Sequence, residues 1–177
     1  MRLLALLLLV LAATPAPAVQ QIFDPEGASF YDVPFPMELR RDGDGSVSLA
    51  GFPFPPGNAL VQSYRVALER TRGFGLASGV FLKFDGAIDP ATLPADPAAS
   101  AAPGSSVFLI DVDPTSPERG RRFPLHAGFQ EDAGPFGATN LLVLLPLQGI
   151  PLAEGTRYAA GVTRAVRDAA GRPLASS

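Results

Sequence analysis

The stretch from Asn140 to Leu174 reads NLLVLLPLQGIPLAEGTRYAAGVTRAVRDAAGRPL and has the clearest local pattern of the chain. Leu141–Leu145 is a continuous apolar run that stops at Pro146, which is the length and ending of a buried strand. A turn sequence, residues 153–156, separates this run from a second strand with strict alternation. Because side chains alternate across a strand, we predict one inward face, formed by Tyr158, Ala160 and Val162.

The end of this stretch has the residues of a closing turn. The carboxylate of Asp168 can accept hydrogen bonds from the amides that follow it, and Gly171 can take a positive φ. Leu174 closes the unit and is expected to be the last residue that stabilises the fold. The stretch predicts an architecture and no reaction. Together with the other strands it predicts a core of Phe84, Val107, Leu109, Leu142, Leu144, Tyr158 and Val162.

Composition favours a single domain with many short strands and turns. The 177 residues are 47% hydrophobic, with 18 Gly and 19 Pro, and a chain of this size buries enough surface without a metal or disulfide. The sequence has no cysteine, which excludes disulfides, zinc–thiolate sites and thiol catalysis. The net charge is −3, and the one basic cluster is Arg119–Arg122, so nucleic acid is not an expected partner. We expect a monomer.

Residues 1–18 have the pattern of a secretory signal peptide. Met1 and Arg2 give a positive start, Leu3–Ala13 is apolar throughout, and Ala16–Ala18 offers small residues for a signal peptidase. A membrane anchor is the alternative, but this run is well short of the roughly 20 residues that span a bilayer. We therefore expect an exported protein, extracellular or periplasmic, whose mature chain begins at Val19.

Residues 19–78 are predicted to form an N-terminal extension that packs on the following domain. Two segments in it, Val33–Pro36 and Gly51–Pro56, combine phenylalanine with too many prolines for a central strand. We expect their phenylalanines to lie as extended covers over a sheet edge. The alternative is a polyproline ligand for a partner protein.

A turn sequence lies between the two Phe-Pro segments. Asp42–Ser46 suggests calcium at first sight, but an EF-hand loop needs glycine and glutamate where Val47 and Pro53 stand. The simpler prediction is a hairpin turn that joins residues 37–40 to residues 46–49.

One amphipathic helix is predicted, over residues 59–72. Asn58 is a suitable N-cap and Gly73 a suitable stop. The apolar face expected to be buried consists of Leu60, Tyr64, Ala67 and Leu68. The charged residues form a solvated face, in which Glu69 is spaced to meet Arg65 and Arg72.

The domain proper is predicted to begin at residue 79. Residues 79–84 and 106–112 alternate as strands, and residues 91–104 have no period and are expected to be an exposed loop. Residues 121–129 should return as the hairpin partner of 106–112, although Pro124 favours an edge position.

Two segments of this domain are similar to a known family. Residues 81–93 read FLKFDGAIDPATL and resemble the opening of bacterial Ig-like domains of the S-layer-protein (SbsA) type, and residues 151–174 resemble that family's closing strands. The resemblance covers about residues 80–174. It implies an all-β fold, an Ig-like antiparallel β-sandwich of about seven strands over residues 79–174, with 175–177 as a tail or the start of a linker.

The whole mature chain also resembles the N-terminal domain that precedes the catalytic domain in bacterial virulence-factor lipases. That domain is non-catalytic, so the resemblance implies no catalytic residue in this chain. The partners that it implies are a downstream domain of the same protein or a cell-surface component.

No catalytic set accompanies the predicted fold. The sequence has no G-x-S-x-G pentapeptide, which an α/β-type serine hydrolase needs for its nucleophile. His126 is the single histidine, and we predict a strand-edge or turn residue rather than a member of a triad. We therefore assign no catalytic, cofactor-binding or metal-binding residue and expect no cofactor.

Two clusters are weighed as binding sites. Three acids could supply hard oxygen ligands to calcium: Asp111, Asp113 and Glu118. The alternative is that these acids, which lie beside a Pro-Thr-Ser-Pro turn, are simply solvated. Three arginines could bind an anion: Arg119, Arg121 and Arg122. We favour the alternative that their charges keep an exposed edge strand from pairing with another chain.

The functional prediction is a non-catalytic, exported Ig-like module that acts as a spacer, docking or stabilising domain of a larger secreted protein. One alternative is a carbohydrate- or cell-surface-binding module, which the absence of Trp and the 3 Tyr disfavour. The other is a hydrolase with an unrecognised pair of carboxylates, for which a pocket with two carboxyls would be required.

Overall fold

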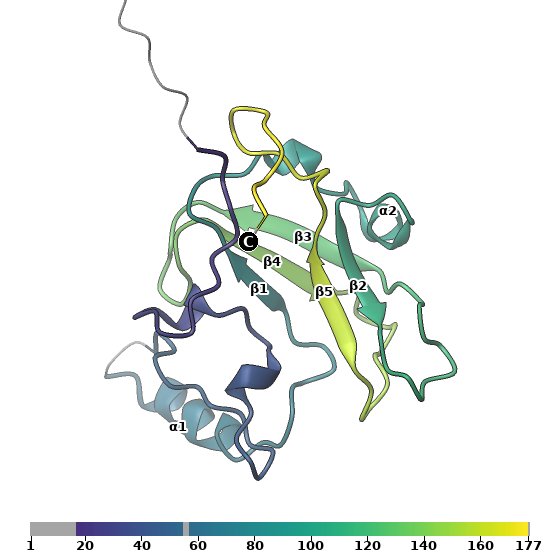
Figure 1. Cartoon of the computed structure of the whole chain (residues 1–177). Coiled ribbons are helices and arrows are strands. Elements are labelled where there is room, and N and C mark those ends of the chain that lie inside the picture. Colours follow the sequence, from purple (N-terminus) through teal and green to yellow (C-terminus); the bar gives the residue numbers. More distant parts are fainter. Residues whose placement is uncertain (1–16, 55–56, 177) are drawn as a thin grey trace, which may run out of the picture.

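Two antiparallel sheets face each other in the computed structural model, which describes residues 17–54 and 57–176 (Figure 1). One sheet has the strand order β1–β4–β3, with β1 at Val80–Lys83, β4 at Leu141–Pro146 and β3 at Leu125–Gln130. The other pairs β2 (Val107–Asp111) with β5 (Tyr158–Val162). The helical elements are α1 (Ala59–Leu68), α2 (Pro97–Ala101) and the 3-10 turns Phe30–Asp32, Glu38–Arg40 and Pro90–Thr92. The predicted signal sequence lies almost wholly outside the described residues.

The β-rich prediction is confirmed, but the number of strands is not. The described residues form five strands, where about seven are predicted. Several other segments make only isolated bridges, because turns and prolines interrupt them before a ladder can extend.

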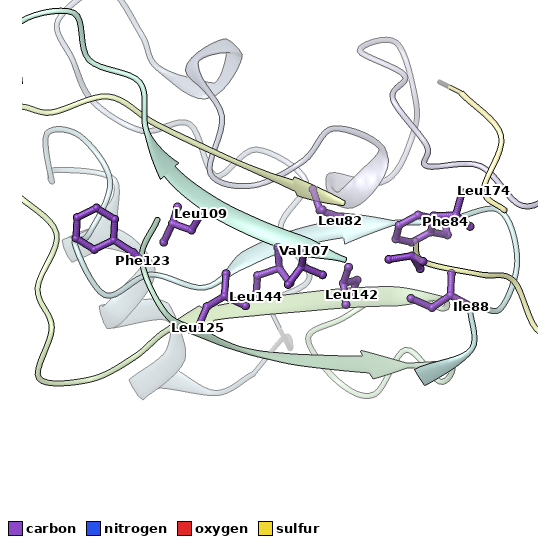
Figure 2. Close-up of a cluster of buried hydrophobic side chains, with 11 residues drawn as sticks. Leu82, Phe84, Ile88, Val107, Leu109, Phe123, Leu125, Leu142, Leu144 and Leu174 are labelled. Atoms are coloured by element: carbon purple, nitrogen blue, oxygen red, sulfur yellow. The ribbon is translucent and has the colours of Figure 1, made fainter. Parts of the chain in front are cut away.

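The main core lies between the two sheets (Figure 2). Five of its predicted members are at most 4% exposed: Phe84, Val107, Leu109, Leu142 and Leu144. The prediction is wrong for Tyr158 and Val162, which pack against this core but stay partly exposed. The reason is that β5 is an edge strand, which pairs with β2 alone among the strands of residues 17–54 and 57–176.

The strand β4 is covered on both faces over residues 141–144, which explains its apolar sequence there, whereas Leu145 is 38% exposed. Leu142 and Leu144 face the main core, whereas Leu141 and Val143 belong to a second cluster. That cluster is built around the aromatic residues of the extension, with Phe30 and Tyr31 buried at 3% and 4% exposure. The molecule therefore has a third layer, formed by the extension.

The extension also covers the free edge of β1. Phe35 and Phe81 exchange two backbone hydrogen bonds, of 3.2 and 2.6 Å. Nearer the start of the chain, Ile22 N–H donates to Lys83 O at 2.8 Å. The predicted role of the first Phe-Pro segment as an edge cover is confirmed for Phe35.

The helix α1 differs from its prediction in two respects. Its N-cap is confirmed, because the side chain of Asn58 accepts hydrogen bonds from the amides of Leu60 and Val61. The helix ends at Leu68 rather than residue 72. The apolar face predicted to be buried is exposed, with Leu60 at 63% and Tyr64 at 61%, because α1 lies at the periphery of the extension (Figure 1).

The expected loop over residues 91–104 is wrong for half of its length. A 3-10 turn occupies Pro90–Thr92 and α2 follows, with Asp96 as N-cap and Pro97 in the first turn. Ser100 on α2 is 1% exposed, and its Oγ accepts a hydrogen bond from Leu125 N at 2.8 Å. The segment is ordered by this contact with the first residue of β3.

Replacing Ser100 by alanine should lower the free energy of unfolding by about 1–3 kcal/mol, because the buried amide of Leu125 then loses its acceptor. Urea melts of the purified protein measure the change. Ser63→Ala, on the exposed α1, is the control and should stay within about 0.5 kcal/mol. If Ser100→Ala lowered the free energy of unfolding as little as Ser63→Ala does, the amide of Leu125 would have found another acceptor.

The segment after β2 changes sheets. Gly120 N donates to Asp111 O and Phe123 N to Leu109 O, so residues 120–123 pair with β2. After Pro124 the chain joins β4 instead, as β3. The predicted hairpin is therefore correct only for residues 121–123, because the next amide of that ladder, Leu125 N–H, donates to Ser100 Oγ instead of to β2. The predicted edge position is confirmed, since β3 pairs with β4 alone.

The closing turn has the predicted hydrogen bonds. Asp168 Oδ1 accepts from the amides of Ala170 and Arg172, both at 2.9 Å, and Gly171 has a φ of 78°. Leu174 is 6% exposed and belongs to the main core. It is not the last stabilising residue, because Ala175 N–H donates to the carbonyl of Val19 at 2.8 Å.

Candidate functional sites

The turn after β2 is held by two buried aspartates. Asp111 and Asp113 are 2% and 7% exposed. Asp111 accepts hydrogen bonds from the amide of Asp113 and the hydroxyl of Ser116. Asp113 accepts from the amide and hydroxyl of Thr115 at 2.8 and 2.7 Å, and from the amide of Arg157 at 3.2 Å. The two carboxylates therefore shape the turn and tie it to the start of β5.

The third acid of the candidate calcium site turns away from the other two. Glu118 forms an exposed ion pair with Arg121. The hydroxyl and amide of Thr115, helped by Arg157, lower the pKa of Asp113 despite its burial. Within residues 17–54 and 57–176, no group of three or more His, Cys, Asp or Glu side chains could hold a metal ion.

Two of the three arginines of the candidate anion site contact different partners. The guanidinium of Arg121 lies 4.8 Å from the ring centre of Phe123, and Arg122 donates to the carbonyl of Ala102 at 3.3 Å. Arg122 also bridges to Ile110 on the outer edge of β2. This placement fits the favoured alternative, in which the arginines flank a covered edge.

His126 lies on the exposed face of the edge strand β3. In the part of the chain that the structure describes, its imidazole has no hydrogen bond with a serine or an acid. The geometry of a catalytic triad is therefore not formed at His126.

The Asp42–Ser46 segment is a tight turn, as predicted. Asp42 N donates to Ser46 O, and Gly45 N donates to Asp42 O, both at 2.9 Å. The hydroxyl and amide of Ser46 both donate to Asp44, which lowers the pKa of that carboxyl. The flanking hairpin is reduced to a single bridge, between Arg41 and Val47.

Two of the depressions on the surface of the described residues are shallow and open. The first, of about 440 Å³, is lined by the extension and has no carboxylate in its wall; Arg40 lies there, with its guanidinium 3.9 Å from the ring centre of Phe30. Burial lowers the pKa of Arg40. The second, of about 470 Å³, is formed by residues 130–137, where Glu131 and Asp132 are neighbours on an exposed loop.

Sequence reasoning missed the polar contacts that join the extension to the sheet. Asp32 and Lys83 form an ion pair at 2.6 Å, with side chains 15% and 18% exposed. The hydroxyl of Tyr31 donates to Phe136 O at 2.6 Å, and burial raises the pKa of this tyrosine. The one signal in the sequence is Lys83, a charged residue on the strand face opposite the core.

Four aspartates have a lowered pKa, and the three that are not exposed, Asp32, Asp113 and Asp168, give the fold its acid sensitivity. Burial favours a higher pKa for Asp32 and Asp168, but hydrogen bonds from Lys83 and Arg172 outweigh it, so both pKa values, like that of Asp113, lie below the ordinary 3.8. The unfolded chain then binds more protons in acid. The free energy of unfolding should be level from pH 7 to about 5 and fall as the pH drops through 3.8 and below.

Urea melts between pH 7 and pH 3 measure this dependence. Asp168→Asn should be less stable than the parent at pH 7 and should lose less on acidification. A parent protein whose stability rises below pH 4 would contradict the lowered pKa values.

Comparison of this chain with protein families, with curated proteins and with solved structures finds no match. None of the helices in the described residues is long and apolar enough to cross a membrane.

Proposed function

We propose that the chain is a non-catalytic, exported Ig-like module that docks against and stabilises another domain of a larger secreted protein. The observation that carries this proposal is the use of the buried carboxylates. Asp111, Asp113 and Asp168 each accept hydrogen bonds from their own turns. Buried carboxylates are the usual candidates for a catalytic acid or base, and these three instead stabilise the fold.

The Ig-like, seven-strand form of the sandwich is part of the same proposal. Short paired segments lie where further strands would run, at residues 20–22 beside β1 and 120–123 beside β2. The sequence resemblance to the S-layer-type domains supports this topology, and the resemblance to the lipase N-terminal domains supports the role. Export rests on the sequence of residues 1–18.

Purified residues 19–177 should show no hydrolysis of short- or long-chain acyl esters above a buffer blank. The expected result is a background rate that repurification does not change. As a control for trace contaminants, the same preparation of an Asp111→Asn, Asp113→Asn variant should give the same background. A rate that copurifies with the folded protein, and that these substitutions remove, would contradict the proposal.

A further inference from the structure

The backbone of β5 has a fixed hydrogen-bond register with β2. Val112 N donates to Arg157 O at 2.9 Å, and Thr163 N donates to Ser106 O at 2.8 Å. These two bonds lie just beyond the opposite ends of the strand pair. Hydrogen-bonded and non-hydrogen-bonded pairs alternate in an antiparallel ladder. The two bonds therefore determine which residues of β5 point their backbone N–H and C=O groups toward β2.

Three residues of β5 direct their backbone groups away from β2. Ala159 and Gly161 turn their N–H and C=O groups toward β2, so Tyr158, Ala160 and Val162 turn theirs outward. Within the described chain no backbone hydrogen bond reaches these outward groups. Among the described strands β5 pairs with β2 alone, and Figure 1 shows the two strands side by side.

The other sheet edges are covered at least in part. Phe35 pairs with the edge of β1, residues 120–123 pair with the edge of β2, and Ser100 accepts from the first amide of β3. The rest of β3 is open but presents polar side chains, among them His126 and Gln130. The sequence of β5, YAAGV, has none of the charged residues or prolines that protect exposed edges.

The core is also incompletely covered beside β5. The inward side chains of β2 are almost fully buried, with Val107 at 0% and Leu109 at 4% exposure. The corresponding side chains of β5 stay partly exposed although they pack against the same core, and so does Val80 on β1. On the opposite side of the sandwich, α2 contacts both β2 and β3. An additional strand beside β5 would cover these apolar groups.

We propose that the outer edge of β5 binds an extended segment of the same secreted protein, which adds to the sheet as an antiparallel strand with apolar side chains at alternate positions. This inference rests on the proposed function, in which the module accompanies another domain. Backbone hydrogen bonds would supply affinity, and the half-covered core would select the alternate apolar side chains.

The size of the edge favours a tethered segment over a second copy of the chain. A stable complex between separate proteins buries roughly 800 Å² per partner, which is more than a five-residue strand edge offers. A segment of the same polypeptide is held at an effective concentration of about millimolar, so a small interface suffices.

The test adds a strand to the existing chain. A flexible Gly-Ser linker and the probe SVFLID, the sequence of residues 106–111 that already pairs with β5, are joined after Ser177. Amide hydrogen exchange, measured by NMR, should slow by at least about tenfold at Tyr158, Ala160 and Val162 relative to the unmodified chain. Ala159 and Gly161 should be protected in both proteins. A control probe with proline at alternate positions should slow nothing.

A second variant isolates the edge. Ala160→Pro removes the central outward N–H without touching the bonds to β2, and it should abolish the protection that the tethered probe gives. Free SVFLID peptide at the protein's own concentration should leave the three amides fast.

Four results would overturn the proposal. The first is protection of the three amides in the unmodified chain that grows with protein concentration, which would assign the edge to a second copy. The second is protection that is independent of concentration, and the third is a tethered probe without effect. The fourth is free peptide that protects as well as tethered peptide. The amide-exchange test does not depend on the ester-hydrolysis test. A protein that hydrolyses esters but whose β5 edge still binds the tethered probe would overturn the proposed function and leave this inference standing.

Discussion

Replacing Phe84 by alanine is expected to lower the free energy of unfolding by about 3–5 kcal/mol. Phe84 is 1% exposed, and Figure 2 shows its ring at the end of the core near Ile88 and Leu174. The substitution leaves a cavity that the surrounding strands cannot fill by a small shift. Because small proteins have only about 5–15 kcal/mol of stability, the loss is a large share of the total.

Urea melts of Phe84→Ala and of a matched control test this expectation. Phe23 is also a phenylalanine but is 48% exposed, so Phe23→Ala should change stability much less. If the two variants lose the same amount, the described core is not what holds the fold.

Replacing Leu174 by alanine is expected to cost about 2–5 kcal/mol. This leucine is 6% exposed and lies in the main core, beyond the closing turn. Removal of the chain from Ala175 onward should cost less, about 0.5–1.5 kcal/mol, because it loses the one hydrogen bond to Val19. Removal from Ser176 onward keeps that bond and should cost almost nothing.

Urea melts of the three variants give the order directly. A loss for the Ser176 truncation as large as that of Leu174→Ala would mean that the fold depends on the residues after Ala175. A negligible loss for Leu174→Ala would mean that the closing turn does not deliver this side chain to the core.

Parts of the candidate sites could be recognised from the sequence, and parts could not. Asp111, Asp113 and Glu118 are visible as a cluster of acids, but only the structure shows that Thr115 and Ser116 hold the first two while Arg121 holds the third. Hydrogen-bond geometry decides between a ligand and a turn-forming side chain, and a sequence pattern does not contain it.

The sequence by itself determined the features that depend on neighbouring residues. The alternation in β1 and β2, the apolar run of β4, the Asn58 cap and the Asp168 turn all arise within a few residues along the chain. Such features follow from side-chain alternation and local hydrogen bonds, which the order of residues fixes directly.

Only the tertiary structure decided how these elements meet. It placed an aromatic layer over part of the second face of β4 and paired Asp32 with Lys83. Within the described residues it left both the apolar face of α1 and the edge of β5 uncovered. These outcomes depend on contacts between segments far apart in sequence. Each such contact is chosen by the fit of whole surfaces and by the entropy of closing the intervening loop, which no local pattern expresses.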